Sequence, residues 1–151
     1  MDRETILHLV CRGRAAGSEV ELISRPPRDG SAPYSTRMFL VNRELCGTHW
    51  SAIASPNPRG ILYSRFVMTR GLLCRSVSQY FVQKIPDGSQ RVFVVPSKLI
   101  FEKYGDQKGD RINIYIAVDL CGPEYHGQKP RIDWRFYLER WPPKKILALA
   151  G

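Results

Sequence analysis

Hydrophobic residues alternate with polar ones in the middle of the chain and recur at helical spacing near its start. Residues 76–84 and 91–95 are rich in β-branched and aromatic side chains, and they flank a Pro-Asp-Gly segment at 86–88. This pattern predicts a β-hairpin, because Asp and Gly tolerate the positive φ angle of a tight reversal. A short helix capped by Ser97 is expected directly afterwards, at residues 98–104.

The first half of the chain predicts a helix, a strand and a second hairpin. The expected elements are a helix at 2–16, a strand at 18–24 and hairpin strands at 38–41 and 45–53. Asp2 is placed to cap the helix, whose apolar face carries Ile6, Leu9, Val10 and Gly13. Proline-rich loops are expected at 25–33 and 55–60, because proline cannot donate a hydrogen bond to a sheet ladder.

The remaining segments complete a mixed architecture. Strand or irregular sheet is expected at 61–69 and 72–77, a clear strand at 111–119, a helix at 132–141 and a loose tail at 142–151. Trp134, Tyr137 and Trp141 in the last helix must be buried, either as anchors of the core or in the face of a homodimer. This order predicts a single α+β or α/β domain over residues 1–151, in which helices flank a mixed β-sheet.

Composition restricts the class of protein. The chain has 151 residues, of which 43% are hydrophobic, and this suits one globular domain. No apolar run approaches the length of a membrane span, and residues 1–4 do not resemble a secretory signal, so we expect a cytoplasmic or nucleoid-associated protein. The four cysteines form no C-x-x-C pair and are expected to be free, buried thiols in a reducing compartment.

Charge indicates a partner class. Lys and Arg number 23 against 14 Asp and Glu, which gives a net charge of +9 and favours a polyanion. We expect nucleic acid, with duplex DNA favoured over RNA, and no membrane, because no amphipathic basic helix is apparent. Tyr63 and Arg65 would share one face of a strand. The predicted nucleic-acid-binding residues are Arg37, Arg59, Tyr63, Arg65, Arg70, Arg75 and Lys84.

Two Cys/His pairs have the spacing of metal ligands. Cys46 and His49 form a C-x₂-H pair, and Cys121 and His126 form a C-x₄-H pair. Together these four side chains would suit a structural tetrahedral zinc site. The alternative is that both cysteines are buried core residues and both histidines lie on the surface.

The element order resembles that of the PD-(D/E)XK endonuclease superfamily. The resemblance lies in Val92-Phe-Val-Val-Pro-Ser97, with its flanking strand and helix, and in the N-terminal helix, strand and hairpin over residues 38–50. In that family, carboxylates on the hairpin hold Mg²⁺ and a lysine steadies the attacked phosphate. Here Arg37 and Met38 open the hairpin, and the return strand offers Gly47-Thr48-His49. The resemblance therefore implies a nuclease-like scaffold that binds DNA without the usual catalytic centre.

Two alternatives remain open. The first is a Mg²⁺-dependent endonuclease whose ligands are displaced to Glu21, Glu44 or Asp87. The second is a basic protein-interaction module, encoded by a phage or another mobile element, that binds an acidic protein.

Overall fold

The computed structural model describes residues 2–26, 33–124 and 129–144. Its helices are α1 (Arg3–Ala15), α2 (Arg70–Arg75), α3 (Ser97–Tyr104) and α4 (Trp134–Tyr137). Its strands are β1 (Val20–Ser24), β2 (Tyr34–Val41), β3 (Glu44–Ile53), β4 (Ser55–Pro56), β5 (Leu62–Thr69), β6 (Ser78–Lys84), β7 (Gln90–Pro96) and β8 (Arg111–Ala117).

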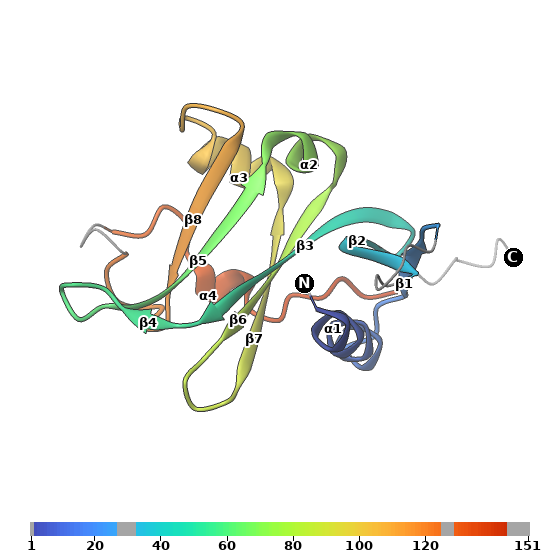
Figure 1. The fold of residues 1–151 in the computed structure, drawn as a ribbon, viewed down its shortest axis with the longest axis horizontal. Helices are drawn as coiled ribbons and strands as arrows, with labels where there is room; N and C mark the ends of the chain where they lie inside the picture. Colours follow the sequence, from blue (N-terminus) through green and yellow to red (C-terminus); the bar gives the residue numbers. More distant parts are fainter. Residues whose placement is uncertain (1, 27–32, 125–128, 145–151) are drawn as a thin grey trace, which may run out of the picture.

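The described strands form two sheets (Figure 1). The larger has five strands in the order β1-β2-β3-β6-β7, in which β3 and β6 run parallel and all other neighbours run antiparallel. The smaller is antiparallel, with the order β4-β5-β8. The prediction of a single α+β domain with a mixed sheet is confirmed, and the second sheet is a feature that the sequence analysis did not separate.

One hydrophobic core, the first core, lies between α1 and one face of the five-stranded sheet. The helix forms as expected, because Asp2 Oδ1 accepts a hydrogen bond from Thr5 N at 2.7 Å. Its apolar stripe packs against sheet residues and the ring of Trp141. The buried members of this core are Ile6, Leu9, Val10, Val20, Phe39, Val41, Cys46, Tyr80, Val82, Val92, Val94 and Trp141.

The second core lies on the other side of the five-stranded sheet. It joins that sheet to β5, β8 and the helices α3 and α4, which lie between β8 and the β6–β7 hairpin in Figure 1. Phe81 and Phe93 on the larger sheet both contact the ring of Trp134 edge-on, with centroids 5.7 and 5.5 Å apart. The alternate residues of β5 and β8, from Phe66 to Ile116, are buried here. Trp134 and Trp141 therefore anchor the cores of their own chain.

Two sequence predictions about local structure are wrong. Residues 72–77 were expected to form strand or irregular sheet, but Arg70–Arg75 form α2, whose first turn is capped by Thr69 Oγ1 accepting from Leu72 N at 3.2 Å. The expected loop at 55–60 contains the two-residue strand β4, which tolerates a proline because it lies at the edge of its sheet.

The caps and the C-terminal segment also differ from expectation. Ser97 is the first residue of α3 and does not cap it; its hydroxyl oxygen accepts a hydrogen bond from Gln79 Nε2 at 2.9 Å. The helix expected at 132–141 is limited to α4, because the next residue, Leu138, pairs with Phe93 of β7. Within the tail, Lys144 N donates to Gly17 O at 2.7 Å, and residues 145–151 lie outside the described residues.

None of the described helices is long and apolar enough to cross a membrane.

The packing of α1 against Trp141 yields a stability test at Gly13. An alanine Cβ here would lie 2.5 Å from Trp141 Cζ3 and 2.8 Å from Val20 Cγ2. Gly13→Ala should therefore lower the free energy of unfolding by about 1–3 kcal/mol, although alanine favours a helix over glycine by about 1 kcal/mol. Urea denaturation followed by circular dichroism measures this change.

The matched control is Gly71→Ala in α2, where no atom beyond the adjacent residues and the helix's own backbone lies within 4 Å of the added Cβ. This variant should be as stable as the parent or gain up to about 1 kcal/mol. Equal stability of the two variants would show that α1 does not pack as described.

Candidate nucleic-acid interface

The outward face of β5 and β8 brings basic, aromatic and amide side chains together. In the antiparallel register Arg65 lies opposite Tyr115, and Val67 lies opposite Asn113. The intervening residues point into the second core, so strand alternation directs this set towards solvent. We call this face the β5–β8 platform; its residues are Tyr63, Arg65, Val67, Thr69, Arg111, Asn113 and Tyr115.

Arg65 occupies the middle of the platform. Its Nε and Nη2 atoms donate to Asn113 Oδ1 at 3.2 and 2.8 Å. The backbone of Asn113 is held in turn by Gln107, whose side chain bonds to both Asn113 N (2.9 Å) and Asn113 O (2.8 Å). The guanidinium group is therefore positioned by a neutral amide, so its charge is not neutralised at this contact.

Arg111, the first residue of β8, adds a second exposed cation. Among the described residues, no carboxylate forms an ion pair with the guanidinium group of Arg65 or Arg111. At the other end of β8, Asp119 and Glu124 lie with Tyr115 around a small hollow. The platform therefore carries cations at its centre and at the Arg111 end, and two carboxylates lie beyond Tyr115.

The platform also carries a pair of aromatic rings. Tyr63 and Tyr115 are diagonal neighbours on adjacent strands, with ring centroids 5.8 Å apart and an interplanar angle of 55°. Both residues are half-buried. Tyr63 is on β5, which pairs with β4 on one side and β8 on the other, so the backbone that carries this ring is fixed on both sides.

Most of the other predicted nucleic-acid-binding residues lie elsewhere. Arg70 points into the 105–109 loop, where its guanidinium group donates to the carbonyl oxygens of Gly105, Gln107 and Gly109. Arg75 Nε donates to Gly71 O at 3.2 Å within α2. These two arginines therefore bind backbone in the structure.

The remaining three are also off the platform. Arg37 is exposed on β2. Lys84 lies at the end of β6, where its Nζ forms an ion pair with Asp2 Oδ2 at 3.8 Å. Arg59 lies in the loop before β5, where its backbone N donates to Asn57 Oδ1. Of the predicted set, only Tyr63 and Arg65 share the platform. Arg111 and Tyr115 were missed, although the alternation of Ile112, Ile114 and Ile116 already places their neighbours on the opposite face.

The proposed zinc ligands on β3 face opposite sides of the sheet. Cys46 belongs to the first core, whereas the ring of His49 stacks on Phe81 of the second core, with centroids 5.1 Å apart. Burial raises the pKa of the Cys46 thiol to about 12, so this side chain is a protonated thiol near neutral pH. The structure therefore does not bring Cys46 and His49 together as a pair of metal ligands.

The second Cys/His pair is only partly described. Cys121 is exposed, as are Cys11 and Cys74, so the expectation of buried thiols is wrong for these three and holds for Cys46. Cys121 Sγ accepts a hydrogen bond from Arg135 Nη1 at 3.5 Å, and His126 lies outside the described residues. In the part of the chain that the structure describes, no three His, Cys, Asp or Glu side chains gather as metal ligands. The acidic residues of the nuclease alternative, Glu21, Glu44 and Asp87, belong respectively to β1, the start of β3 and the β6–β7 turn.

His49 instead belongs to a buried polar network. Its Nε2–H donates to Gln79 Oε1 at 2.7 Å, and Gln79 Nε2 donates to the hydroxyl oxygens of Ser76 (2.5 Å) and Ser97 (2.9 Å). Desolvation lowers the pKa of His49 from 6.5 to about 4, against the opposing effect of the Gln79 hydrogen bond. His49 is therefore neutral at pH 7, and its hydrogen bond to Gln79 links β3 to β6.

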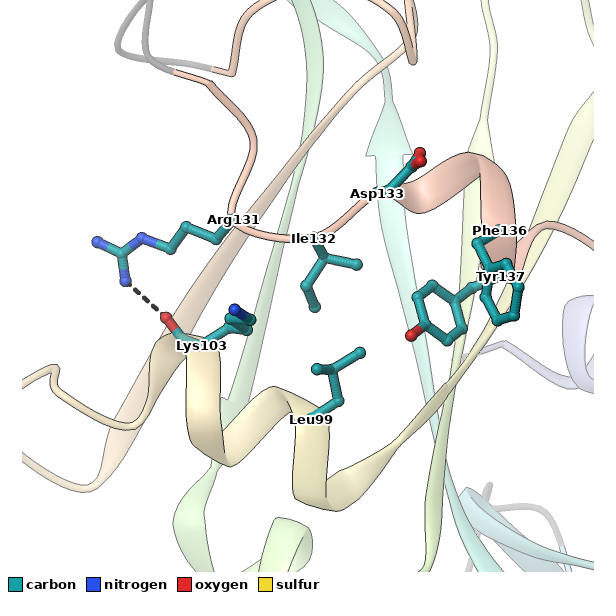
Figure 2. A pocket seen from close by; sticks show the side chains of 7 residues that line it. All are labelled: Leu99, Lys103, Arg131, Ile132, Asp133, Phe136 and Tyr137. Carbon is teal, nitrogen blue, oxygen red and sulfur yellow. Dashed lines mark hydrogen bonds between the residues drawn. The ribbon is translucent and has the colours of Figure 1, made fainter.

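Two grooves of similar size lie outside the platform. The first, of about 470 Å³, lies between α3 and α4, where Leu99, Ile132 and Tyr137 point into the hollow (Figure 2). Arg131 turns away from it and donates to Lys103 O at 3.0 Å. The second, of about 490 Å³, lies between α1 and the β6–β7 turn and mixes acidic with basic side chains. Neither combines exposed cations with aromatic rings on a flat sheet.

Comparison of the chain with protein-family models, with curated proteins and with solved structures returned no match.

The contacts of Arg70 lead to a prediction that separates folding from binding. Arg70→Ala removes hydrogen bonds from a charged donor to backbone carbonyls, so the free energy of unfolding should fall by about 1.5–3 kcal/mol. If the parent binds a nucleic acid, the folded variant should lose no more affinity than Arg3→Ala, which removes one exposed charge from α1. If Arg70→Ala lost affinity for nucleic acid while its stability stayed unchanged, Arg70 would belong to the interface and not to the fold.

The lowered pKa of His49 predicts a pH-dependent stability. The unfolded chain binds a proton at His49 below pH 6.5, whereas the folded chain does so only below about pH 4. Lowering the pH from 7 to 4 therefore favours unfolding, by about 3 kcal/mol in total. Urea midpoints at pH 7, 6 and 5 measure this loss.

The matched variants replace one histidine each. His49→Gln should flatten the decline in stability between pH 7 and pH 5, whereas His8→Gln, on the exposed face of α1, should leave it unchanged. A decline that persists in His49→Gln would assign the pH dependence to another group.

Proposed function

We propose that the protein binds nucleic acid through the β5–β8 platform. The observation that carries this proposal is the position of Arg65, an exposed cation held by Asn113 and flanked by aromatic rings on an open sheet face. Arginine contacts phosphate through a planar fork of N–H donors and also stacks on bases. The platform therefore offers phosphate contacts and apolar ring faces within one surface.

The charge of the whole chain supports the same partner. A net charge of +9 attracts a polyanion over distances of about a Debye length, roughly 8–10 Å at physiological salt. At contact, Arg65 and Arg111 would each neutralise a phosphate, because neither is paired with a described carboxylate. Binding would depend on counterion release and so weaken steeply as salt is raised.

The nuclease-like scaffold remains part of this proposal. The helix, strand and hairpin that begin the resemblance are α1, β1 and β2–β3, and its later strands and helix are β6, β7 and α3. In this interpretation the scaffold binds without an assembled carboxylate centre. The sequence pattern favoured duplex DNA; the proposed function itself claims only nucleic acid, and the following experiment compares single-stranded and duplex DNA and RNA.

Removal of the platform cations tests the proposed function. Arg65→Ala and Arg111→Ala should each weaken binding about 5- to 10-fold at 0.1 M salt and reduce the log-log salt slope by about 0.7–0.9, the contribution of one phosphate contact. Fluorescence anisotropy with 20-nucleotide single-stranded and duplex DNA and RNA measures both quantities between 50 and 300 mM salt.

Arg3→Ala is the charge-matched control, because Arg3 is exposed on α1 and belongs to a different layer. It should change affinity by less than twofold. Equal effects of all three variants would show that only net charge matters. Failure of the parent to bind any of the four nucleic acids would contradict the proposal and leave the basic protein-interaction module.

A further inference from the structure

We infer that the platform binds unpaired nucleotides, whose bases stack on Tyr63 and Tyr115 while Arg65 holds the adjoining phosphate. This inference rests on the proposed function and specifies its substrate class. The observation behind this inference is the placement of two tyrosines beside Arg65. Tyr115 lies directly opposite Arg65, and Tyr63 lies two residues before Arg65 on β5.

The two rings form one aromatic surface on rigid backbone. Their centroids are 5.8 Å apart, and their half-buried positions limit the rotation of each ring. Tyr63 lies on the central strand of its sheet, where Ser55 and Ala117 are its partners on either side. A surface fixed before binding loses little side-chain entropy when a base is placed on it.

The shape of the platform favours a single strand over a duplex. In a duplex the faces of the bases are covered by their neighbours, so a ring on a flat sheet cannot stack on them. An unpaired base exposes its whole face, and such stacking is tolerant of base identity. A pleated sheet face also differs from the protruding helix or two-stranded ribbon that usually enters the major groove.

The distribution of charge points in the same direction. Duplex binding by charge alone gains affinity with each phosphate contact, because each contact releases condensed counterions. On the platform, Arg65 and Arg111 are the arginines, and Asp119 and Glu124 lie near Tyr115 at the far end. Two arginines make only a few phosphate contacts, so tight binding to the platform needs the additional free energy of base stacking. The acidic end would repel phosphates, so the backbone is expected to follow Arg65 and Arg111 while the bases lie over the tyrosines.

An abasic oligonucleotide separates base stacking from phosphate contact in the unmodified protein. We would compare a fluorescein-labelled 12-nucleotide thymidine strand, the same backbone with tetrahydrofuran at every position in place of bases, and a 12-base-pair duplex, all at 0.1 M salt. The thymidine strand should bind roughly 10-fold or more tightly than either of the others, because it alone offers unpaired bases.

Variants of the two rings then locate the effect. Tyr63→Leu and Tyr115→Leu should each weaken binding of the thymidine strand roughly 5- to 100-fold, with affinity for the abasic strand changed by less than twofold. Tyr63→Phe and Tyr115→Phe keep the ring and should stay within about threefold of the parent. Circular dichroism confirms that each variant is folded.

The outcomes distinguish this inference from the function on which it rests. Equal affinity for the thymidine and abasic strands, or tighter binding of the duplex, with retained sensitivity to Arg65→Ala, would overturn base stacking and leave phosphate binding intact. Absence of binding to every oligonucleotide would overturn both.

Discussion

The parallel pairing of β3 with β6 is the constraint from which the rest of the molecule follows. Parallel neighbours cannot be joined by a tight turn and need a crossover of about a dozen residues or more. Here the crossover spans residues 54–77 and contains β4, β5 and α2. Because α1 already covers one face of the five-stranded sheet, the crossover lies over the other face. The second sheet, and with it the platform, exists because of this connection.

A buried polar network holds the crossover in register. His49 on β3 bonds to Gln79 on β6, and Gln79 bonds to Ser76, next to the end of α2, and to Ser97 at the start of α3. Gly47 makes this possible, since a Cβ at that position would overlap the Gln79 amide. In a dry interior each unmade hydrogen bond costs about 1–3 kcal/mol, so the network favours one arrangement of these elements over its competitors.

Local pattern was enough to predict most elements but not their assembly. The β6–β7 hairpin, the apolar face of α1 and the strand around Ile114 follow from turn chemistry and periodicity, which are properties of neighbouring residues. The segment around Leu72 and Leu73 was predicted as extended chain but forms α2, because a short buried helix and a buried strand have similar apolar runs. Tertiary packing decided between them.

The candidate site illustrates the same limit. That Tyr63 and Arg65 share a face follows from strand alternation alone, but the approach of Tyr115 depends on the register between β5 and β8. Cys46 and His49 are close in the sequence, yet their odd spacing on a strand places them on opposite faces. That parity was readable from the sequence once a strand was assumed there, and it should have counted against a shared metal.

Net charge and local chemistry have different roles in this protein. Several arginines serve the fold: Arg14 donates to Val20 O, Arg91 to Val118 O and Arg70 to Gly105 O. A guanidinium group bonded to backbone carbonyls keeps its charge, because a carbonyl oxygen does not neutralise it. These residues therefore still contribute to the long-range electrostatic field, although their side chains are held in place by hydrogen bonds to loops and strand ends. Under the proposed function, attraction of a polyanion belongs to the whole surface, whereas recognition comes from the few places where a cation, a ring and an amide meet. Because Arg65 is held by an uncharged amide in the open, the β5–β8 platform is such a place.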